Sequence, residues 1–161
     1  MSEKIPAELD PVVAAVRTIA AEFESDGAFH YDGENRWHCD LNIADESIEG
    51  ALFLLDSDDP LLAVYVVIRL PNALEHIELL LKALAYTNNG LLPGCFEIDL
   101  QTGEMHYRNA LAPVSNQITP REVAHLLGAA LMMTKTYSPA FQKIAATGVN
   151  PIAAIDEIEA D

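Results

Sequence analysis

The first periodic segment of the chain, residues 11–23, has the pattern of an amphipathic α-helix. Its apolar residues recur at intervals of three and four positions, which places them along one face of a helix. Asp10 and Pro11 stand at its start, a pair that is typical of a helix N-cap followed by the first helical position. We expect a helix that covers a core with its apolar face, formed by Val12, Val13, Val16, Ile19, Ala20 and Phe23.

Three segments with the periodicity of β-strands follow. Residues 36–43 alternate between apolar and polar side chains, which predicts a strand with one covered face and places Trp37 and Cys39 on that face. Residues 50–56 and 61–70 come next, on either side of an acidic turn. The last segment is apolar at nearly every position, as expected for a strand covered on both faces or placed at the centre of a sheet. We predict three antiparallel strands.

A second helix is predicted over residues 71–88, and it is apolar on two sides. Such a helix needs two surfaces to pack against, whereas a monomer built of two layers offers only one. We therefore expect a homodimer. One apolar stripe consists of Leu74, Ile77, Leu81, Leu84 and Asn88, and the other, which we predict to form the dimer interface, consists of Leu79, Leu80, Ala83 and Tyr86.

The second half of the chain predicts a β-hairpin followed by helices. Residues 95–99 and 104–110 read as two short strands joined by turn residues. Thr119 and Glu122 form a capping box around Pro120, which predicts a helix start, and the Ser138-Pro139 step should break or kink that helix. A last helix is expected over residues 151–158. The element order is αβββαββα with extra helical turns at the end, which indicates a single α+β domain with an antiparallel sheet packed against helices and not a doubly wound parallel sheet.

The hairpin region also carries a family resemblance. The matching positions, which continue through Tyr137 to Pro139, are Asn88, the Pro93-Gly94 step, Phe96, Asp99, Gly103 and Arg108. They stand as they do in YbjN-domain proteins, which are small bacterial proteins similar in fold to class I type III secretion chaperones. The resemblance implies a type III secretion chaperone-like fold and a regulatory or chaperone-like protein that holds another polypeptide. The alternative is a dedicated secretion chaperone that wraps an extended effector segment around an acidic dimer.

The charge of the chain restricts its partners. A formal net charge of −16 with only nine Lys and Arg residues argues against nucleic acid and anionic lipid, because both need clustered cations. A basic polypeptide remains as a partner, and an acidic surface that serves solubility alone is the other interpretation. Apolar runs stay well below the ~18 residues that a membrane span requires, and no basic leader precedes an apolar run. We expect a cytoplasmic protein.

The sequence offers little support for cofactor or metal chemistry. A Gly-rich turn that joins a strand to a helix, as phosphate binding would need, is missing. His38 and Asp40 share the solvent face of one strand and would need a third metal ligand from a neighbour. The acidic cluster of Asp56, Asp58 and Asp59 has the wrong spacing for a calcium loop. We predict no cofactor and no metal.

The hairpin offers the remaining candidate residues. Its outward face should present Cys95, Glu97, His106 and Arg108, which we predict to be a partner surface, and Asp99 could pair with Arg108 across the strands. Cys95 and His106 would also be the pair for a thiol enzyme or small hydrolase. Since the signatures of catalytic cysteines are absent, we predict no catalytic residue and expect Cys39 and Cys95 to be free thiols.

Overall fold

The computed structural model describes residues 4–58, 61–91, 93–113 and 117–160. Within them, one antiparallel sheet has the strand order β1-β2-β3-β4-β6-β5. The strands are β1 (His30–Gly33), β2 (Arg36–Leu41), β3 (Ile48–Asp56), β4 (Leu61–Ile68), β5 (Cys95–Ile98) and β6 (Met105–Leu111). The helices are α1 (Asp10–Glu22), α2 (Ile77–Asn88), α3 (Pro120–Thr147) and α4 (Pro151–Glu159), with short 3-10 turns at Ala7–Leu9 and Ala73–His76.

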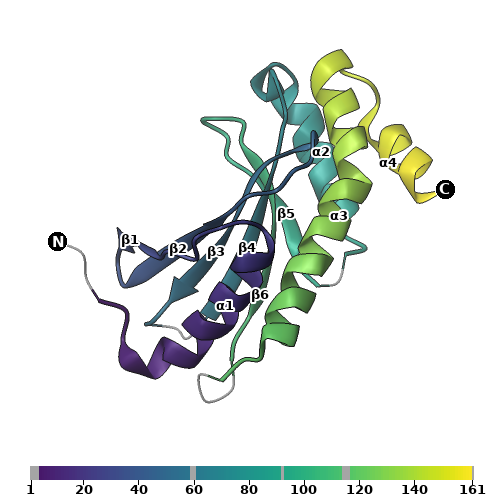
Figure 1. The fold of residues 1–161 in the computed structure, drawn as a ribbon. Helices are drawn as coiled ribbons and strands as arrows, with labels where there is room; N and C mark the ends of the chain where they lie inside the picture. Colours follow the sequence, from purple (N-terminus) through teal and green to yellow (C-terminus); the bar gives the residue numbers. More distant parts are fainter. Residues whose placement is uncertain (1–3, 59–60, 92, 114–116, 161) are drawn as a thin grey trace.

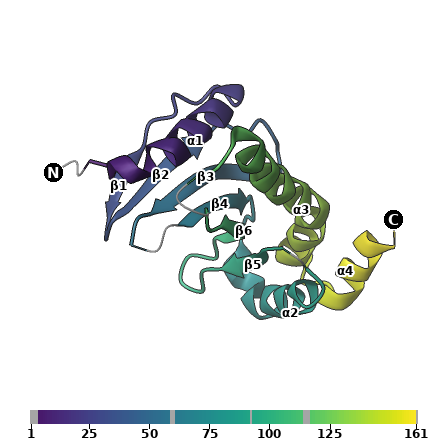
Figure 2. The ribbon, with the colours of Figure 1, turned by 90° about the horizontal axis from the view of Figure 1, so that it is seen from below.

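Helices α1, α2 and α3 lie on one side of the sheet, and α4 packs outside them against α2 and α3 (Figure 1 and Figure 2). The predicted α+β class with an antiparallel sheet is confirmed. The core lies between the sheet and these helices. Its largest fully buried side chains are Tyr107, Phe53, Phe96, Phe141, Leu9, Ile48, Leu55, Leu62, Ile68, Leu80, Met105 and Leu127.

Strand β1 is an addition to the predicted order, which had five strands and not six. It has only four residues and no apolar alternation, so the sequence pattern does not mark it. It is held by a two-residue hairpin turn in which Glu34 and Asn35 both have positive φ, the geometry of a tight turn between antiparallel strands. The expected alternation of β2 is confirmed, since Trp37 and Cys39 are buried.

The central position of β4 explains its apolar run. β4 pairs with β3 along one edge and with β6 along the other, so its main-chain groups are used on both sides. Its inward residues Leu62, Val64 and Val66 are fully buried, whereas Tyr65 and Val67 on the other face are only half-buried. The apolar sequence of this strand could reflect burial on both faces or a central place in the sheet. The structure shows the second, because β4 is central and only one of its faces is covered.

Helix α2 packs on two sides within the chain. One side packs on the sheet and α3, and the other is covered by α4, whose Asp156 accepts a hydrogen bond of 2.7 Å from the Tyr86 hydroxyl. Leu80 and Ala83 therefore have no exposed surface. The premise that a single chain offers only one surface to this helix was wrong, because α4 supplies the second.

Two of the predicted helix boundaries were wrong. Helix α3 runs without a break through Pro139, and the buried Tyr137 and Phe141 beside that proline pack into an aromatic cluster with Phe96, which holds the helix in place. Helix α1 begins at Asp10 itself, because a 3-10 turn leads into it and makes Leu9 the N-cap. None of the helices in the described ranges is long and apolar enough to cross a membrane.

The other helix signals are confirmed. Thr119 and Glu122 make both hydrogen bonds of a capping box at the start of α3. Asn150 caps α4 by accepting a hydrogen bond of 3.1 Å from the main-chain N–H of Ala153. α3 ends at Gly148, whose φ of 64° is the left-handed conformation that terminates many helices.

Replacing Gly128 with alanine should stabilise the protein. Gly128 is an exposed position inside α3, and a Cβ added there would meet no atom within 4 Å. Alanine gains about 0.5–1 kcal/mol over glycine in a helix interior because the unfolded chain loses conformational freedom. Urea unfolding of Gly128→Ala should show a higher midpoint with an unchanged slope. A midpoint equal to or below that of the wild type would contradict the helix assignment at this residue.

Candidate functional site

One face of the sheet carries no helix from the described part of the chain (Figure 2). The strand register places an apolar centre on this face, formed by half-buried side chains of the two middle strands: Leu52 and Leu54 of β3 and Tyr65 and Val67 of β4. We call this surface the open face. A row of apolar side chains that a folded chain leaves uncovered is typical of a surface that binds another molecule.

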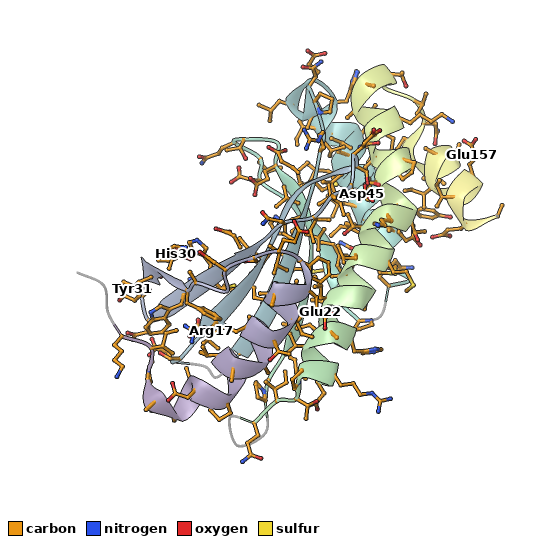
Figure 3. The ribbon with its side chains drawn as sticks, in the orientation of Figure 1. Arg17, Glu22, His30, Tyr31, Asp45 and Glu157 are labelled. Carbon is orange, nitrogen blue, oxygen red and sulfur yellow. The ribbon has the colours of Figure 1, made fainter. Side chains whose placement is uncertain are left out.

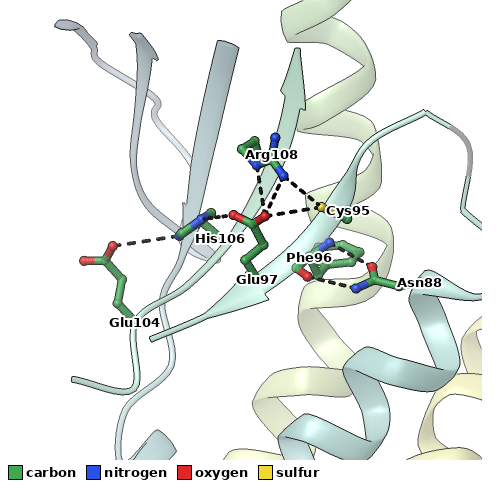
Figure 4. Close-up of polar contacts among 7 residues, drawn as sticks. All are labelled: Asn88, Cys95, Phe96, Glu97, Glu104, His106 and Arg108. Carbon is green, nitrogen blue, oxygen red and sulfur yellow. Dashed lines mark hydrogen bonds and ion pairs between the residues drawn. The ribbon is translucent and has the colours of Figure 1, made fainter. Parts of the chain in front are cut away.

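A polar cluster borders the open face on β5 and β6, and it contains the four predicted partner-surface residues (Figure 4). Glu97 is at its centre. Its Oε1 accepts hydrogen bonds from Arg108 Nε at 3.0 Å and Nη2 at 2.7 Å, and its Oε2 lies 3.0 Å from His106 Nε2. The Cys95 Sγ lies 3.6 Å from Glu97 Oε1 and 3.8 Å from Arg108 Nη2. The sequence analysis therefore placed these four side chains on one face correctly.

Arg108 neutralises the charge of Glu97. The hydrogen bond from Arg108 is the main reason that the pKa of Glu97 is lowered, and burial opposes it. The same pair raises the pKa of Arg108. His106 also packs edge to face on Tyr65, with ring centroids 5.1 Å apart, which joins the polar cluster to the apolar centre. Because both partners of the ion pair are bonded to each other, the cluster adds little net charge to the open face.

Cys95 does not have the environment of a nucleophile. Burial is the first cause that raises the pKa of its thiol, and the neighbouring Glu97 carboxylate raises it further. Catalytic cysteines need the opposite, a cationic setting that favours the thiolate. The Nε2 of His106 lies against Glu97, and among the described residues the Cys95 sulfur contacts Glu97 and Arg108 and not His106.

The thiol of Cys95 should therefore titrate above the ordinary cysteine value of about 8.5. We expect its reaction with iodoacetamide near pH 7.5 to be slower than that of a free cysteine peptide, because the thiolate is the reacting species. Since Cys39 is fully buried, native protein should report Cys95 alone. The measurement is the alkylation rate from pH 6 to 10, and a midpoint below 8 would contradict this account and revive the thiol-enzyme alternative.

The hairpin is held by the residues that carry the family resemblance. The Asn88 side chain binds both main-chain groups of Phe96: its Nδ2 donates to the carbonyl at 2.9 Å, and its Oδ1 accepts from the N–H at 2.8 Å (Figure 4). This closes the free edge of β5 at Phe96. Asp99 accepts hydrogen bonds from the main-chain N–H groups of Gln101 and Thr102 and thereby shapes the turn. The predicted pair of Asp99 with Arg108 was wrong, because each has its own partner.

The candidate metal ligands are engaged with one another. His38 lies between two carboxylates, with Nδ1 2.6 Å from Asp32 and Nε2 3.6 Å from Asp40. Over residues 4–58, 61–91, 93–113 and 117–160, no three His, Cys, Asp or Glu side chains come together as a metal site would require. Asp59 of the acidic cluster lies outside the described residues. The two cysteines are free thiols, as expected.

Of the residues predicted for the dimer interface, Tyr86 alone keeps an exposed side chain. Leu80 and Ala83 are buried in the chain's own core, Leu79 is half-buried, and Tyr86 is bonded to α4. The other predicted stripe includes Leu74 in the 3-10 turn before α2 and Leu81 on α2, which keep 49% and 40% of their surface. The apolar face of the helix predicted over residues 151–158 was the signal that could have shown this, because that face packs against α2.

No known protein-family profile matches the chain, and no curated protein matches its sequence. Solved structures do match it. A chain of the ExsC–ExsE complex superposes with a TM-score of 0.61 at 19% identity, over 81% of this chain and 93% of that one. YbjN from E. coli superposes with a TM-score of 0.54 at 14% identity, over 90% of this chain and 96% of that one. A chain of the HopA1–SchA chaperone–effector complex superposes with a TM-score of 0.55 at 11% identity, over 83% of this chain and 99% of that one. The YbjN-like, type III secretion chaperone-like fold is confirmed.

Proposed function

We propose that the protein is a non-catalytic, homodimeric module of YbjN type that binds another polypeptide in a regulatory or chaperone-like role. The observation that carries the proposal is the open face, whose apolar centre has a border of paired charges. Two of the similar folds come from complexes, one of them between a chaperone and its effector. That likeness favours a second candidate, a dedicated secretion chaperone. The cytoplasmic location stays a prediction.

A partner would bind the open face through side chains. β4 offers no main-chain groups to an added strand, because it is paired on both edges. Apolar side chains of the partner would pack on Leu54, Tyr65 and Val67. This binding needs no change in the sheet.

The acidic surface supports a partner that is basic overall. Carboxylates are spread over helices and loops around the sheet, for example Glu22 on α1, Asp45 in the β2–β3 loop and Glu157 on α4 (Figure 3). Complementary charge accelerates association and selects partners, and salt screens it over a Debye length of about 8 Å at 0.15 M. Binding of such a partner should weaken as salt rises, while the apolar contacts persist.

The exposed stripe of α2 supports the homodimer. Leu81 lies on α2 and Leu74 in the 3-10 turn before it, with the half-buried Ile77 between them in the sequence, and Leu100 in the β5–β6 turn keeps 62% of its surface. That turn lies close to the stripe, because a Cβ added to Gly103 would be 3.2 Å from Leu74 Cγ. A second copy that packs on this stripe would leave the open face available to the partner.

Affinity capture with a matched pair of variants tests the binding function. Wild-type protein, Leu54→Lys and Met132→Lys would be immobilised and exposed to a lysate of the native cells. A polypeptide captured by wild type and Met132→Lys but lost by Leu54→Lys would support the open face, because Met132 is an exposed apolar residue of α3 away from it. Equal capture by all three would contradict the proposal. Titration of the captured chain between about 50 and 500 mM salt then tests the charge.

A further inference from the structure

The apolar centre of the open face offers side chains and no main-chain groups to a partner. At Leu52 and Leu54, strand β3 pairs with β2 along one edge and with β4 along the other, and Tyr65 and Val67 of β4 pair with β3 and β6. Their N–H and C=O groups are therefore used within the sheet. In the described chain the free edges belong to β1 and β5, and a further strand separates each of them from the apolar centre. A strand added at either edge would not cover this centre.

A segment that covers the apolar centre has to satisfy its own main-chain groups. An extended segment laid across these side chains would bury N–H and C=O groups without partners, whereas such groups are nearly always paired in folded proteins. An α-helix bonds these groups within itself. The chain covers the other face of its sheet in this way, with α1, α2 and α3 (Figure 2). The open face therefore fits a helix better than a strand.

The apolar surface has the length of a short helix. On β4 the outward row runs from Leu61 through the buried Ala63 to Tyr65 and Val67, and the two leucines of β3 lie beside it. Six residue steps along a strand span about 20 Å. A helix covers that length with about 13 residues, or roughly three to four turns.

Carboxylates gather on the margin of the open face over β1 and β2. Asp32 and Asp40 lie on either side of His38, at 2.6 Å and 3.6 Å from its ring nitrogens, and among the described residues neither is paired with a lysine or arginine. Asp40 keeps 68% of its side-chain surface. Glu34 lies 3.5 Å from Arg36, but that guanidinium is already bonded to a carboxylate of β3. This margin therefore attracts cations.

The opposite margin, over β5 and β6, is less acidic. There Arg108 neutralises Glu97 at 2.7 Å, and Glu104 lies 4.0 Å from His106. The electrostatic field across the open face thus has a direction, with its more negative side at β1 and β2. A helix with lysine or arginine along one flank would lie with that flank toward these two strands.

A second copy of this chain is a poor occupant of the open face. It would bring a formal net charge of −16 to a face with an acidic margin. Helix α4, which exposes Ile152, carries Asp156, Glu157 and Glu159, so its approach would set like charges against Asp40. Complementary charge selects a basic partner instead.

We propose that the open face binds an amphipathic α-helix of a partner protein, roughly three to four turns long, with lysine or arginine along one flank. Its apolar side packs on Leu54, Tyr65 and Val67. Its basic flank lies against Asp32 and Asp40. This inference rests on the proposed polypeptide-binding function and specifies the kind of segment that the same surface takes, which is helical and basic and neither extended nor acidic.

Three fluorescein-labelled peptides of about 14 residues test the kind of segment by fluorescence anisotropy at 0.15 M salt. The helical basic peptide carries leucines at intervals of three and four positions and lysines along one flank. The alternating peptide has the same composition with leucine at every second position, and the acidic peptide is the helical one with glutamate in place of lysine. The helical basic peptide should bind about tenfold more tightly than either of the others, and circular dichroism should show added helix in its complex. Equal or tighter binding of another peptide, or no saturable binding of this one, would overturn the proposal.

Matched variants locate the binding of the helical basic peptide. Leu54→Lys should weaken it about tenfold, whereas Met132→Lys adds the same charge to an exposed residue of α3 and should leave it unchanged. Val67→Lys repeats the test at a second half-buried position in case Leu54→Lys lowers the thermal midpoint. Asp40→Asn should weaken binding about two- to fivefold, the usual range for an exposed ion pair. Glu22→Gln removes the same charge from α1, on the helix-covered side of the sheet, and should have no effect (Figure 3). Unchanged binding to both lysine variants of the open face would overturn the proposal, and so would equal effects of Asp40→Asn and Glu22→Gln.

The same measurements separate this inference from the proposed function. A natural partner that is captured by wild type and lost by Leu54→Lys, together with an alternating peptide that binds as tightly as the helical one, would keep the open face as a polypeptide-binding surface and overturn the helical segment. A change of oligomeric state in Leu54→Lys without any peptide binding to the wild type would also overturn the inference, because the face would then be a contact between copies of the chain. Loss of the partner by Leu54→Lys with the expected order of the three peptides would support it.

Discussion

Replacing Gly94 with alanine should destabilise the protein by about 3 kcal/mol or more. Gly94 has a φ of 90°, which costs about 1–2 kcal/mol for a residue with a side chain. In addition, an alanine Cβ would lie 2.6 Å from the main-chain oxygen of Arg108. A main-chain oxygen cannot turn aside as the end of a flexible side chain can. The start of β5 must therefore move away from β6. For a chain of this size the thermal midpoint should fall by about 10 °C.

Gly90 provides the matched control for this prediction. It lies in the same connection between α2 and β5, is exposed, and would place no atom within 4 Å of an added Cβ. Gly90→Ala should therefore shift the midpoint by at most 1 or 2 °C. Both variants should be compared at one protein concentration, since association also raises the midpoint. If Gly94→Ala were as stable as Gly90→Ala, the close packing of Gly94 on β6 would be wrong.

The effect of Gly94→Ala should also be visible at the polar cluster. The Tyr107 hydroxyl donates a hydrogen bond to the carbonyl of Pro93, so a shift of the 93–94 segment breaks a contact of a fully buried tyrosine. Cys95 follows directly and would move away from Arg108. We expect its thiol to become more accessible to iodoacetamide in the variant. An unchanged rate would show that β5 keeps its place and that the strain is absorbed in the loop.

The sequence predicted those parts of the fold in which one face of an element is apolar and the other polar. The alternation from Trp37 to Leu41 fixed which side of β2 is buried, and the capping box at Thr119 fixed where α3 begins. Strand β1 could not be predicted because its four residues lack that contrast and depend on a turn of positive φ. Pro139 was misread because a local preference against helix was overcome by the packing of Tyr137 and Phe141.

The candidate surfaces could be predicted only in part. Alternation put Cys95, Glu97, His106 and Arg108 on one side of the hairpin, and these residues do form one cluster. The open face was hidden because β4 is apolar on both sides, so its half-exposed residues look like core residues in the sequence. The choice between the two stripes of α2 depended on where α4 packs, a contact more than 60 residues away along the chain that no local pattern records.

Replacing Leu81 with aspartate should convert the proposed homodimer to a monomer. Leu81 keeps 40% of its surface in the single chain, so aspartate is tolerated there until a second copy buries it. Burying an unpaired carboxylate in an apolar contact costs several kcal/mol, which corresponds to a dissociation constant raised at least a hundredfold. Light scattering at micromolar concentration should return twice the chain mass of 17.5 kDa for the wild type and 17.5 kDa for the variant.

Two further variants show whether this result concerns the interface. Met132→Asp places the same charge on an exposed apolar residue of α3 and should remain dimeric. Ala83→Asp, at a position fully buried inside the chain, should unfold the protein instead of dissociating it, because no second copy is needed to bury that carboxylate. A wild-type mass of 17.5 kDa would refute the homodimer. A Leu81→Asp variant that stays dimeric would show that the interface lies outside the α2 stripe. Leu54→Lys would then test the open face as the contact between the two copies.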